Sequence, residues 1–407
     1  MKKILILLLC LIITVSAAAC GSGSGTQDSG GEPAPEEAKA AHTIAVLVYD
    51  RTDEEVLSFK RYLEEYIAKE FDVEFLYSDS ISTPEEALDF ISSAADYGAE
   101  GVMSFNSYDL KSEVELCADK GIYFMMASGT VSEPAFEAVA DNEAFLGVVG
   151  PGNDFEYKAG ADMAEHALAA GPADEGEQHQ FFIMSGGAAI GNEMHRLRTI
   201  GAIDKLAEAY GIKFDKTSED IARTEEPLVV ESGDLKICVC PGYPTMDGID
   251  ETVKEAFTAD SYDVVLGALP VTKFMDLFEG AYVGTVDCYS ESNLILFNSG
   301  RLNYVSGKYS SIIGPSFAAM YNAVTGHAEE FRDDGRAFRI CQGFWSSDSR
   351  EDYEEKYSLA SSIEKVAYNY EDLQKVMAEY TPGATLEDLR KLAEAYTYED
   401  AVARRAE

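Results

Sequence analysis

A predicted helix start in the middle of the chain concentrates side chains that could bind a ligand. His195, Arg196 and Arg198 follow the apolar run 181–184 and a small-residue turn. This order of residue types predicts a buried strand, a turn, and a helix capped by Asn192. The amino end of a helix carries partial positive charge, which disfavours cations there. We therefore expect an acidic or strongly hydrogen-bonding partner near this helix.

The sequence lacks the common enzyme motifs of open α/β sheets. Neither G-x-x-x-x-G-K-[ST] nor H-E-x-x-H occurs in it. The glycine-rich stretch 185–191 lacks the order G-x-G-x-x-G, and 314–318 (GPSFA) ends in alanine where a nucleophile elbow has glycine. Only His195 among the five scattered histidines would lie near a site, and a surface position in the first helical turn is favoured for it. We expect no catalytic residue, no metal and no cofactor.

The cysteines do not form a disulfide framework. Of seven, Cys10 lies in the leader and Cys20 follows it, which leaves an odd, scattered five. Cys238 and Cys240 alternate on a strand-like segment and would share one face, which is poor disulfide geometry. No histidine lies near enough in sequence to complete a zinc site, so we interpret them as small buried hydrophobic residues.

The chain is strongly acidic, with 32 Lys and Arg against 73 Asp and Glu and a net charge of −41. Removing Lys2 and Lys3 with the leader leaves 30 against 73, or −43. This balance argues against nucleic acid as a partner. A self-repelling surface explains it better than a cationic ligand does.

The first twenty residues predict a leader. Lys2 and Lys3 precede an apolar run over 4–15 that is short for a bilayer span, and three alanines over 17–19 precede Cys20. This order resembles the bacterial lipoprotein signal, which implies lipidation of Cys20. The alternative is a secreted protein with an incidental cysteine. Residues 21–41 are polar and rich in Gly and Ser, and would form a tether reaching roughly 25 Å.

Strands and helices are expected to alternate in two successive sets. Helices between strands predict parallel sheets covered on both faces, and two sets predict two domains with a cleft between them. The expected strands are 43–49, 73–77, 101–105, 122–126 and 145–149, then 181–184, 236–240, 263–267, 282–287, 303–309 and 337–342. Expected helices include 53–71, 109–119, 249–257, 272–278 and 315–325, and residues 346–407 are helical by pattern with a break at 380–383. Packing against one domain is the default for this last segment.

With the leader and the tether, this arrangement resembles the type I periplasmic-binding-protein family, the ribose and galactose group of solute receptors for ABC transporters. The resemblance covers residues 43–342. It implies two Rossmann-like parallel-sheet domains that close on a ligand about a multi-crossover hinge and dock on a permease. The implied parts are a signal (1–20), a tether (21–41), an N-terminal domain (43–151 and 309–330), a C-terminal domain (152–308 and 331–345) and a helical extension (346–407).

The resemblance also implies ligand contacts, because motifs of the ribose group can be matched one by one. The R-x-R-x-x-G motif of the restart helix is present at 196–201, and its second arginine is Arg198. Departures are Glu55 and Val56 in place of stacking aromatics, no Asp-Arg pair at 127–129, and Leu269 in place of asparagine. The implied ligand contacts are Asp53, Asn106, Arg198, Tyr243, Asp287 and Lys308.

These residue types suit a polyhydroxylated ligand. Asp287 and Asn106 supply acceptors, Arg198 a fork of donors, and Tyr243 an apolar face for C–H groups. Each also has a structural alternative. Asn106, Asp287 and Asp53 could cap the following helices, Arg198 could lie on the surface, and Tyr243 could be packing.

The sequence thus predicts a lipid-anchored, monomeric extracytoplasmic receptor that captures a small polar ligand, with a sugar favoured, and delivers it to an ABC permease. One alternative within this class is a nucleoside or other small metabolite as ligand. The alternative from another class is a receptor that hands its closed form to a membrane sensor kinase.

Overall fold

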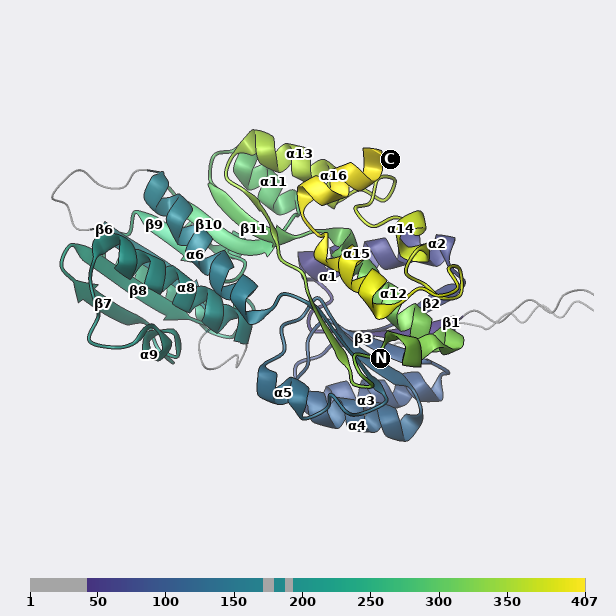
Figure 1. Cartoon of the computed structure of the whole chain (residues 1–407). Helices are drawn as coiled ribbons and strands as arrows, with labels where there is room; N and C mark the ends of the chain where they lie inside the picture. The colour runs from purple at the N-terminus through teal and green to yellow at the C-terminus, as the bar shows by residue number, and fades with distance from the viewer. Residues whose placement is uncertain (1–41, 171–178, 187–192, 407) are drawn as a thin grey trace, which may run out of the picture. The chain divides into compact units, whose positions relative to one another are not determined.

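The computed structural model describes residues 42–170, 179–186 and 193–406. The expected signal with Cys20, the tether and the expected helix cap Asn192 lie outside the described residues. The described residues form two β-sheets flanked by helices (Figure 1). We refer to each sheet with its helices as a lobe.

The first lobe is built on an all-parallel sheet with the strand order β12-β5-β4-β3-β1-β2. Alternate residues of β1 enter different cores: Ala45 and Leu47 pack with α3 and α4, and Ile44 and Val46 pack with α1 and α12 (Figure 1). A strand buried on both faces therefore reads as a continuous apolar run. The elements are β1 (His42–Val48), α1 (Glu54–Tyr62) with a π-turn (Leu63–Ile67), α2 (Ala68–Glu70), β2 (Val73–Ser80), α3 (Pro84–Asp96), β3 (Gly101–Ser104), α4 (Leu110–Lys120), β4 (Tyr123–Ala127), α5 (Glu133–Glu137), β5 (Phe145–Gly150), a 3-10 turn (Ser310–Ile313), α12 (Gly314–Asn322) with further turns (Ala323–His327, Ala328–Phe331) and β12 (Phe338–Cys341).

The second lobe is built on a seven-stranded sheet with the order β13-β11-β10-β9-β6-β8-β7. Its inner strands are parallel, and the edge strands β7 and β13 are antiparallel to their neighbours. Helices α6 and α8 pack closely side by side on this sheet because Gly160 and Gly201 have no side chains (Figure 1). The elements are α6 (Asn153–Ala169), β6 (His179–Ser185), α8 (Glu193–Tyr210), α9 (Ser218–Ala222), β7 (Leu228–Ser232), β8 (Leu235–Pro241), α10 (Ile249–Thr258), β9 (Val264–Gly267), a 3-10 turn (Thr272–Phe274), β10 (Tyr282–Cys288), α11 (Glu291–Asn298), β11 (Tyr304–Lys308) and β13 (Trp345–Ser347).

The strands expected from the sequence are present, with ends shifted by a few residues. The helix expected over 272–278 is wrong: a 3-10 turn is followed by further turns, with the Leu277 N–H donating to the Phe274 carbonyl at 2.9 Å. These tight turns bring the adjacent side chains Phe274 and Met275 into one core. Cys238 and Cys240 are buried in β8 and free, as expected.

Strand β12, at the end of the region 43–342 that resembles the periplasmic-binding-protein family, belongs to the first sheet. The sequence places 331–345 in the second domain, whereas β12 pairs in parallel with β5 of the first lobe. Gly147 of β5 permits this approach, because a Cβ atom there would lie 2.1 Å from the Phe338 carbonyl oxygen. The chain then crosses to the second lobe, where β13 pairs with β11.

The helical extension contacts both lobes rather than one. It contains α13 (Arg350–Ala360), α14 (Tyr370–Gln374), α15 (Leu386–Glu394) and α16 (Tyr398–Ala406). In the second lobe, the Tyr353 hydroxyl accepts from the Ser290 N–H at 2.9 Å and donates to the Ser290 carbonyl at 3.0 Å. In the first lobe, the Asn322 side chain donates to the Val376 carbonyl and accepts from the Ala378 N–H. The extension therefore ties the two sheets together outside the strand crossovers.

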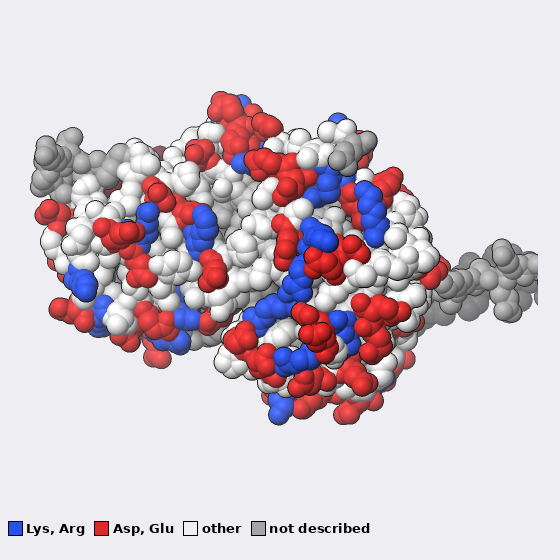
Figure 2. Space-filling view, in the orientation of Figure 1, with Lys and Arg blue, Asp and Glu red and all other residues white. Residues whose placement is uncertain are grey.

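Acidic side chains cover much of the visible surface, with lysines and arginines between them (Figure 2). On this face the basic residues form no broad continuous patch. The distribution on this face fits a self-repelling surface.

Candidate ligand-binding site

Several of the expected ligand contacts lie where strands of the two sheets end. Asp53 follows β1 of the first lobe, Tyr243 follows β8, and Asp287 and Lys308 lie at the ends of β10 and β11 in the second lobe. In open parallel sheets, ligands bind outside the carboxyl ends of the strands. Contacts between these residues and their neighbours bring the two lobes together there.

Asp53 caps α1 and also reaches the second lobe. Its Oδ1 accepts from the N–H groups of Glu55 and Val56 and from the Tyr49 hydroxyl at 3.0 Å. Its Oδ2 accepts from the Tyr243 hydroxyl at 3.3 Å. Burial, followed by the negative charge of Glu55, raises the pKa of Asp53 to about 6. Asp53 is thus a helix cap and an inter-lobe contact at once.

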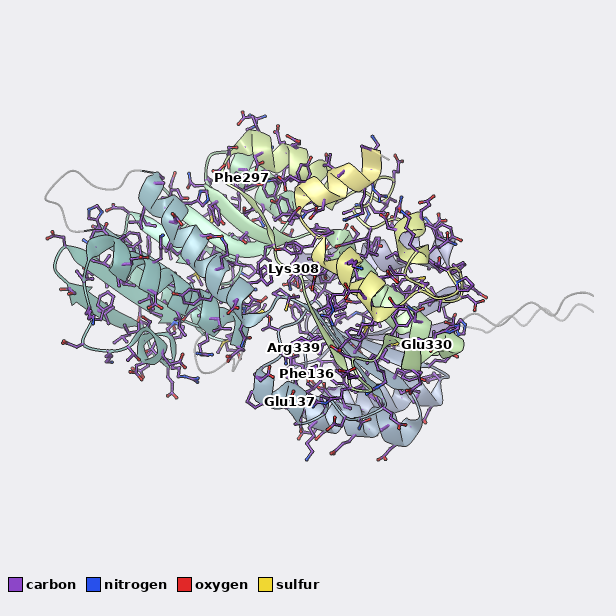
Figure 3. All side chains as sticks on the ribbon, in the orientation of Figure 1. Phe136, Glu137, Phe297, Lys308, Glu330 and Arg339 are labelled. Carbon is purple, nitrogen blue, oxygen red and sulfur yellow. The ribbon has the colours of Figure 1, made fainter. Side chains whose placement is uncertain are left out.

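Lys308 is a buried cation at the end of β11 (Figure 3). Its Nζ donates to Glu55 Oε1 at 3.1 Å and to the Ser128 carbonyl at 2.9 Å, both in the first lobe. Ser128 has φ 66°, a left-handed conformation that is uncommon for a residue with a side chain and often found at functional sites. Glu55 is the counter-ion of Lys308. In the comparison with the ribose group it stands out only because it replaces a stacking aromatic residue.

Asp287 is held by neutral donors. Its Oδ1 accepts from the Cys288 N–H at 2.8 Å, and its Oδ2 accepts from Asn293 Nδ2 at 2.9 Å. Burial, followed by the negative charge of Asp53, raises the pKa of Asp287 to about 7. The alternative that Asp287 caps the next helix is wrong, because Ser290 caps α11.

Arg198 is buried and bonded to protein groups. Its Nε donates to Glu156 Oε2 at 2.5 Å, and one terminal nitrogen donates to the Ala268 carbonyl at 3.1 Å. Glu156, which is wholly buried on α6, also accepts from the Thr130 hydroxyl of the first lobe at 2.8 Å. Glu156 is therefore an acidic partner of the kind expected near the cationic residues at the start of α8. A surface position for Arg198 is wrong, and its contact with a ligand stays a prediction.

His195 is buried, so its expected surface position is wrong. Its ring stacks on the Tyr243 ring, with centroids 5.9 Å apart and planes at 25°. Gly186 leaves room for the imidazole, since a Cβ there would lie 2.5 Å from Nδ1. Burial, followed by the positive charges of Arg198 and Lys308, lowers the pKa of His195 to about 3. The imidazole is therefore neutral at physiological pH.

Asn106 lies apart from the hydrogen bonds that join the other expected contacts in the described part of the chain. The Ser104 hydroxyl donates to its backbone carbonyl, and its amide lies beside the Tyr108 hydroxyl. Among the described residues, no hydrogen bond joins its side chain to the other expected contacts. A helix-cap role for Asn106 is wrong, because Asp109 caps α4.

A cavity of about 180 Å³ borders this region, with walls from α1, α11, α13 and the ends of β10 and β11. Glu54, Tyr289 and Ser290 are among its lining residues. A larger cavity of about 330 Å³ lies beside Tyr282 and Asn303, at the amino ends of β10 and β11 and so at the opposite sheet edge. None of the six expected contacts, all within the described residues, lines either cavity, although Glu54 in the wall of the smaller one directly follows Asp53 in the sequence.

No protein-family model matches the sequence, and no curated protein matches it. Solved structures do match. A Pseudomonas fluorescens periplasmic sugar-binding protein has 13% identity and a TM-score of 0.62, over 88% of this chain and 99% of that chain. An ABC transporter solute-binding protein from Bacillus halodurans, with bound myo-inositol, has 15% identity and a TM-score of 0.56, over 79% and 99%. One from Actinobacillus succinogenes, with bound D-allose, has 12% identity and a TM-score of 0.57, over 77% and 99%.

This chain has the type I periplasmic-binding-protein fold. The predicted fold class is thereby confirmed: two parallel-rich sheets, with the chain crossing between lobes after β5, β11 and β12. At such identities the similarity concerns the fold, and function has to be argued from the site.

The described residues contain no helix that could span a membrane and no group of residues that could hold a metal ion. None of their helices is long and apolar enough to cross a bilayer. Within the same ranges, no three His, Cys, Asp or Glu side chains are grouped so that they could hold a metal ion.

Proposed function

We propose that this protein is a lipid-anchored extracytoplasmic receptor that captures a small polar molecule, with a sugar favoured, and presents it to an ABC permease. Binding rather than catalysis is its activity. The ligand lies between the lobes, contacts Asp53, Tyr243, Asp287 and Lys308, and stabilises the closed arrangement through its contacts to both. Arg198 and Asn106 are further proposed contacts.

The observation that carries this proposal is the meeting of polar and aromatic groups from both lobes at the strand ends. The Tyr243 hydroxyl reaches Asp53, and Lys308 reaches Glu55 and Ser128. A concave site with an aromatic face and a few placed polar groups suits a polyhydroxylated ligand. The bound myo-inositol and D-allose of two solved structures with this fold support the same ligand class.

The lipid anchor is supported by the residue order around Cys20. Replacing Cys20 by serine should move the protein from the membrane fraction to the aqueous fraction of an expressing bacterium. Retention on the membrane by the Cys20→Ser variant would contradict the anchor without affecting the ligand proposal.

Thermal unfolding of the purified full chain in mild detergent tests the ligand proposal. A panel of sugars, nucleosides, amino acids and small acids is added one at a time, because a ligand that binds only the folded state stabilises it by about 2.7 kcal/mol at a hundredfold excess over Kd. We expect sugars to raise the melting temperature.

Paired tyrosine variants make this screen specific for the site. Tyr243→Leu should abolish the shift because it removes the stacking face and the hydroxyl. Tyr97→Leu is the control, because Tyr97 is 84% exposed. No response to any sugar, or an equal response in both variants, would refute the proposed site.

A further inference from the structure

The buried cations of the candidate site are already neutralised by protein carboxylates. Arg198 pairs with Glu156 at 2.5 Å, and its side chain and that of Glu156 are 6% and 0% exposed. Lys308 pairs with Glu55 at 3.1 Å, and those side chains are 5% and 17% exposed. Both cations also donate to backbone carbonyls. An anionic ligand would therefore compete with these buried pairs for their charge.

Two carboxylates of the same site have no such partner. Among the described residues, neither Asp53 nor Asp287 forms an ion pair, and both accept only from hydroxyl, amide and backbone donors. They come from different lobes, and each feels a neighbouring negative charge. Both side chains are half-buried, and a half-buried charge without a counter-ion still carries a desolvation cost. A cation bound between the lobes would therefore compensate the negative charge of Asp53 and Asp287.

Buried hydrogen-bonding atoms beside these carboxylates point the same way. Asn293 is wholly buried, its Nδ2 donates to Asp287, and its Oδ1 has no partner within the described ranges. His195 is 6% exposed, stacks on the tyrosine that donates to Asp53, and its Nδ1 has no partner there either. A carbonyl oxygen accepts, and one nitrogen of a neutral imidazole accepts. Unused atoms at this site therefore include Asn293 Oδ1, which is an acceptor, and His195 Nδ1, which accepts in one tautomer, whereas the charges of Arg198 and Lys308 are already paired with Glu156 and Glu55.

We propose that the ligand is a cation with hydroxyl groups, such as an amino sugar or an aminated polyol, whose ammonium group lies between Asp53 and Asp287. This inference rests on the proposed sugar-binding function and narrows its ligand class. The ammonium satisfies the two carboxylates, hydroxyl groups donate to the unused acceptors, and the Tyr243 ring receives the C–H face.

Calorimetric titration of the purified full chain in mild detergent tests the inference with probes that differ in one group. Hexoses, the corresponding 2-amino sugars and the corresponding uronates are compared at pH 7 and low salt, where the amino group of the amino sugar is mainly protonated, with putrescine as a cation without hydroxyl groups. We expect an amino sugar to bind at least about tenfold more tightly than its parent hexose, and the uronate to show no binding. Affinity for the amino sugar should fall from pH 7 to pH 5, because the ligand stays cationic in this range while protons compete for the same carboxylates.

Variants identify the carboxylates responsible. Asp53→Asn and Asp287→Asn should each reduce the preference for the amino sugar over the hexose at least about tenfold, and Asp79→Asn, at an exposed aspartate, should preserve it. Equal or tighter binding of the hexose or the uronate would overturn the charge inference and leave the sugar proposal standing. Binding of putrescine alone would keep the charge inference and remove the sugar. Binding of no probe would overturn both.

Discussion

Replacing Asp287 by asparagine should stabilise the protein at alkaline pH and lose this effect in mild acid. Asp287 is half-buried at the end of β10, without a cationic partner among the described residues. Its pKa rises from 3.8 to about 7 because of burial and then the charge of Asp53. A carboxylate with a raised pKa destabilises the fold above that pKa, where it must ionise. The stability cost is therefore present at pH 8 and disappears as pH falls from about 7 towards 4.

The size of the effect follows from the two pKa values. Each pKa unit corresponds to about 1.4 kcal/mol, so ionising Asp287 costs at most about 4 kcal/mol. Partial exposure of the side chain reduces this to about 2 kcal/mol. The new amide meets Asn293 Nδ2, a donor facing a donor, which costs about 1 kcal/mol. We expect a net gain of about 1 kcal/mol at pH 8 and almost no net change at pH 5, where about two fifths of the ionisation cost remains.

Urea unfolding of the ligand-free protein at both pH values measures this difference. Asp79→Asn is the control, because the Asp79 side chain is 91% exposed and its pair with Arg51 is at the surface. The control should show little change between the two pH values. A constant difference between the Asp287→Asn variant and the parent from pH 8 to pH 5 would show that Asp287 is not a strained carboxylate.

Three other changes test separate parts of the site. Glu156→Gln should lower the free energy of unfolding by about 3 kcal/mol, because Arg198 is left buried without a counter-ion; circular dichroism during urea unfolding would measure it, and an unchanged midpoint would contradict the pairing. Gly160→Ala should lower the free energy of unfolding by more than about 2 kcal/mol, because the new Cβ would lie 1.8 Å from the Arg198 carbonyl oxygen and force α6 away from α8. A melting temperature equal to that of the parent protein would refute the close packing of the two helices. Tyr243→Phe should remove the hydrogen bond to Asp53 and favour opening of the lobes, measured as a larger radius of gyration by small-angle X-ray scattering, whereas an unchanged radius would mean that this contact does not hold the lobes.

The sequence alone was sufficient for the fold class. Continuous apolar runs alternating with capped helices can form only sheets that are covered on both faces, and their repetition after residue 181 predicts a second sheet. The cap of α3 is a local feature of this kind, because the Thr83 side chain accepts from the Glu86 N–H and the Glu86 side chain accepts from the Thr83 N–H. Such features depend on neighbours in the chain, which the sequence displays directly.

The partners of the site residues were decided by tertiary structure. Glu156 lies on α6, a helix not among those expected from the sequence, and is 42 residues from Arg198 along the chain. Glu55 and Lys308 are 253 residues apart, and a departure from a family motif gave no sign that they would pair. Burial of His195 likewise depends on the space left by Gly186 and on the ring of Tyr243.

The sequence therefore determined which residue types were available, and the tertiary structure determined which charges cancel. Hydrophobic periodicity and helix caps act over a few residues, so they can be read in order along the chain. Ion pairs form between side chains that are distant in sequence, and their energies depend on burial. The sequence therefore predicts neither the pairing of Arg198 nor the lack of a cationic partner for Asp53 and Asp287 among the described residues. That difference is the basis on which we propose a cationic ligand rather than a neutral sugar.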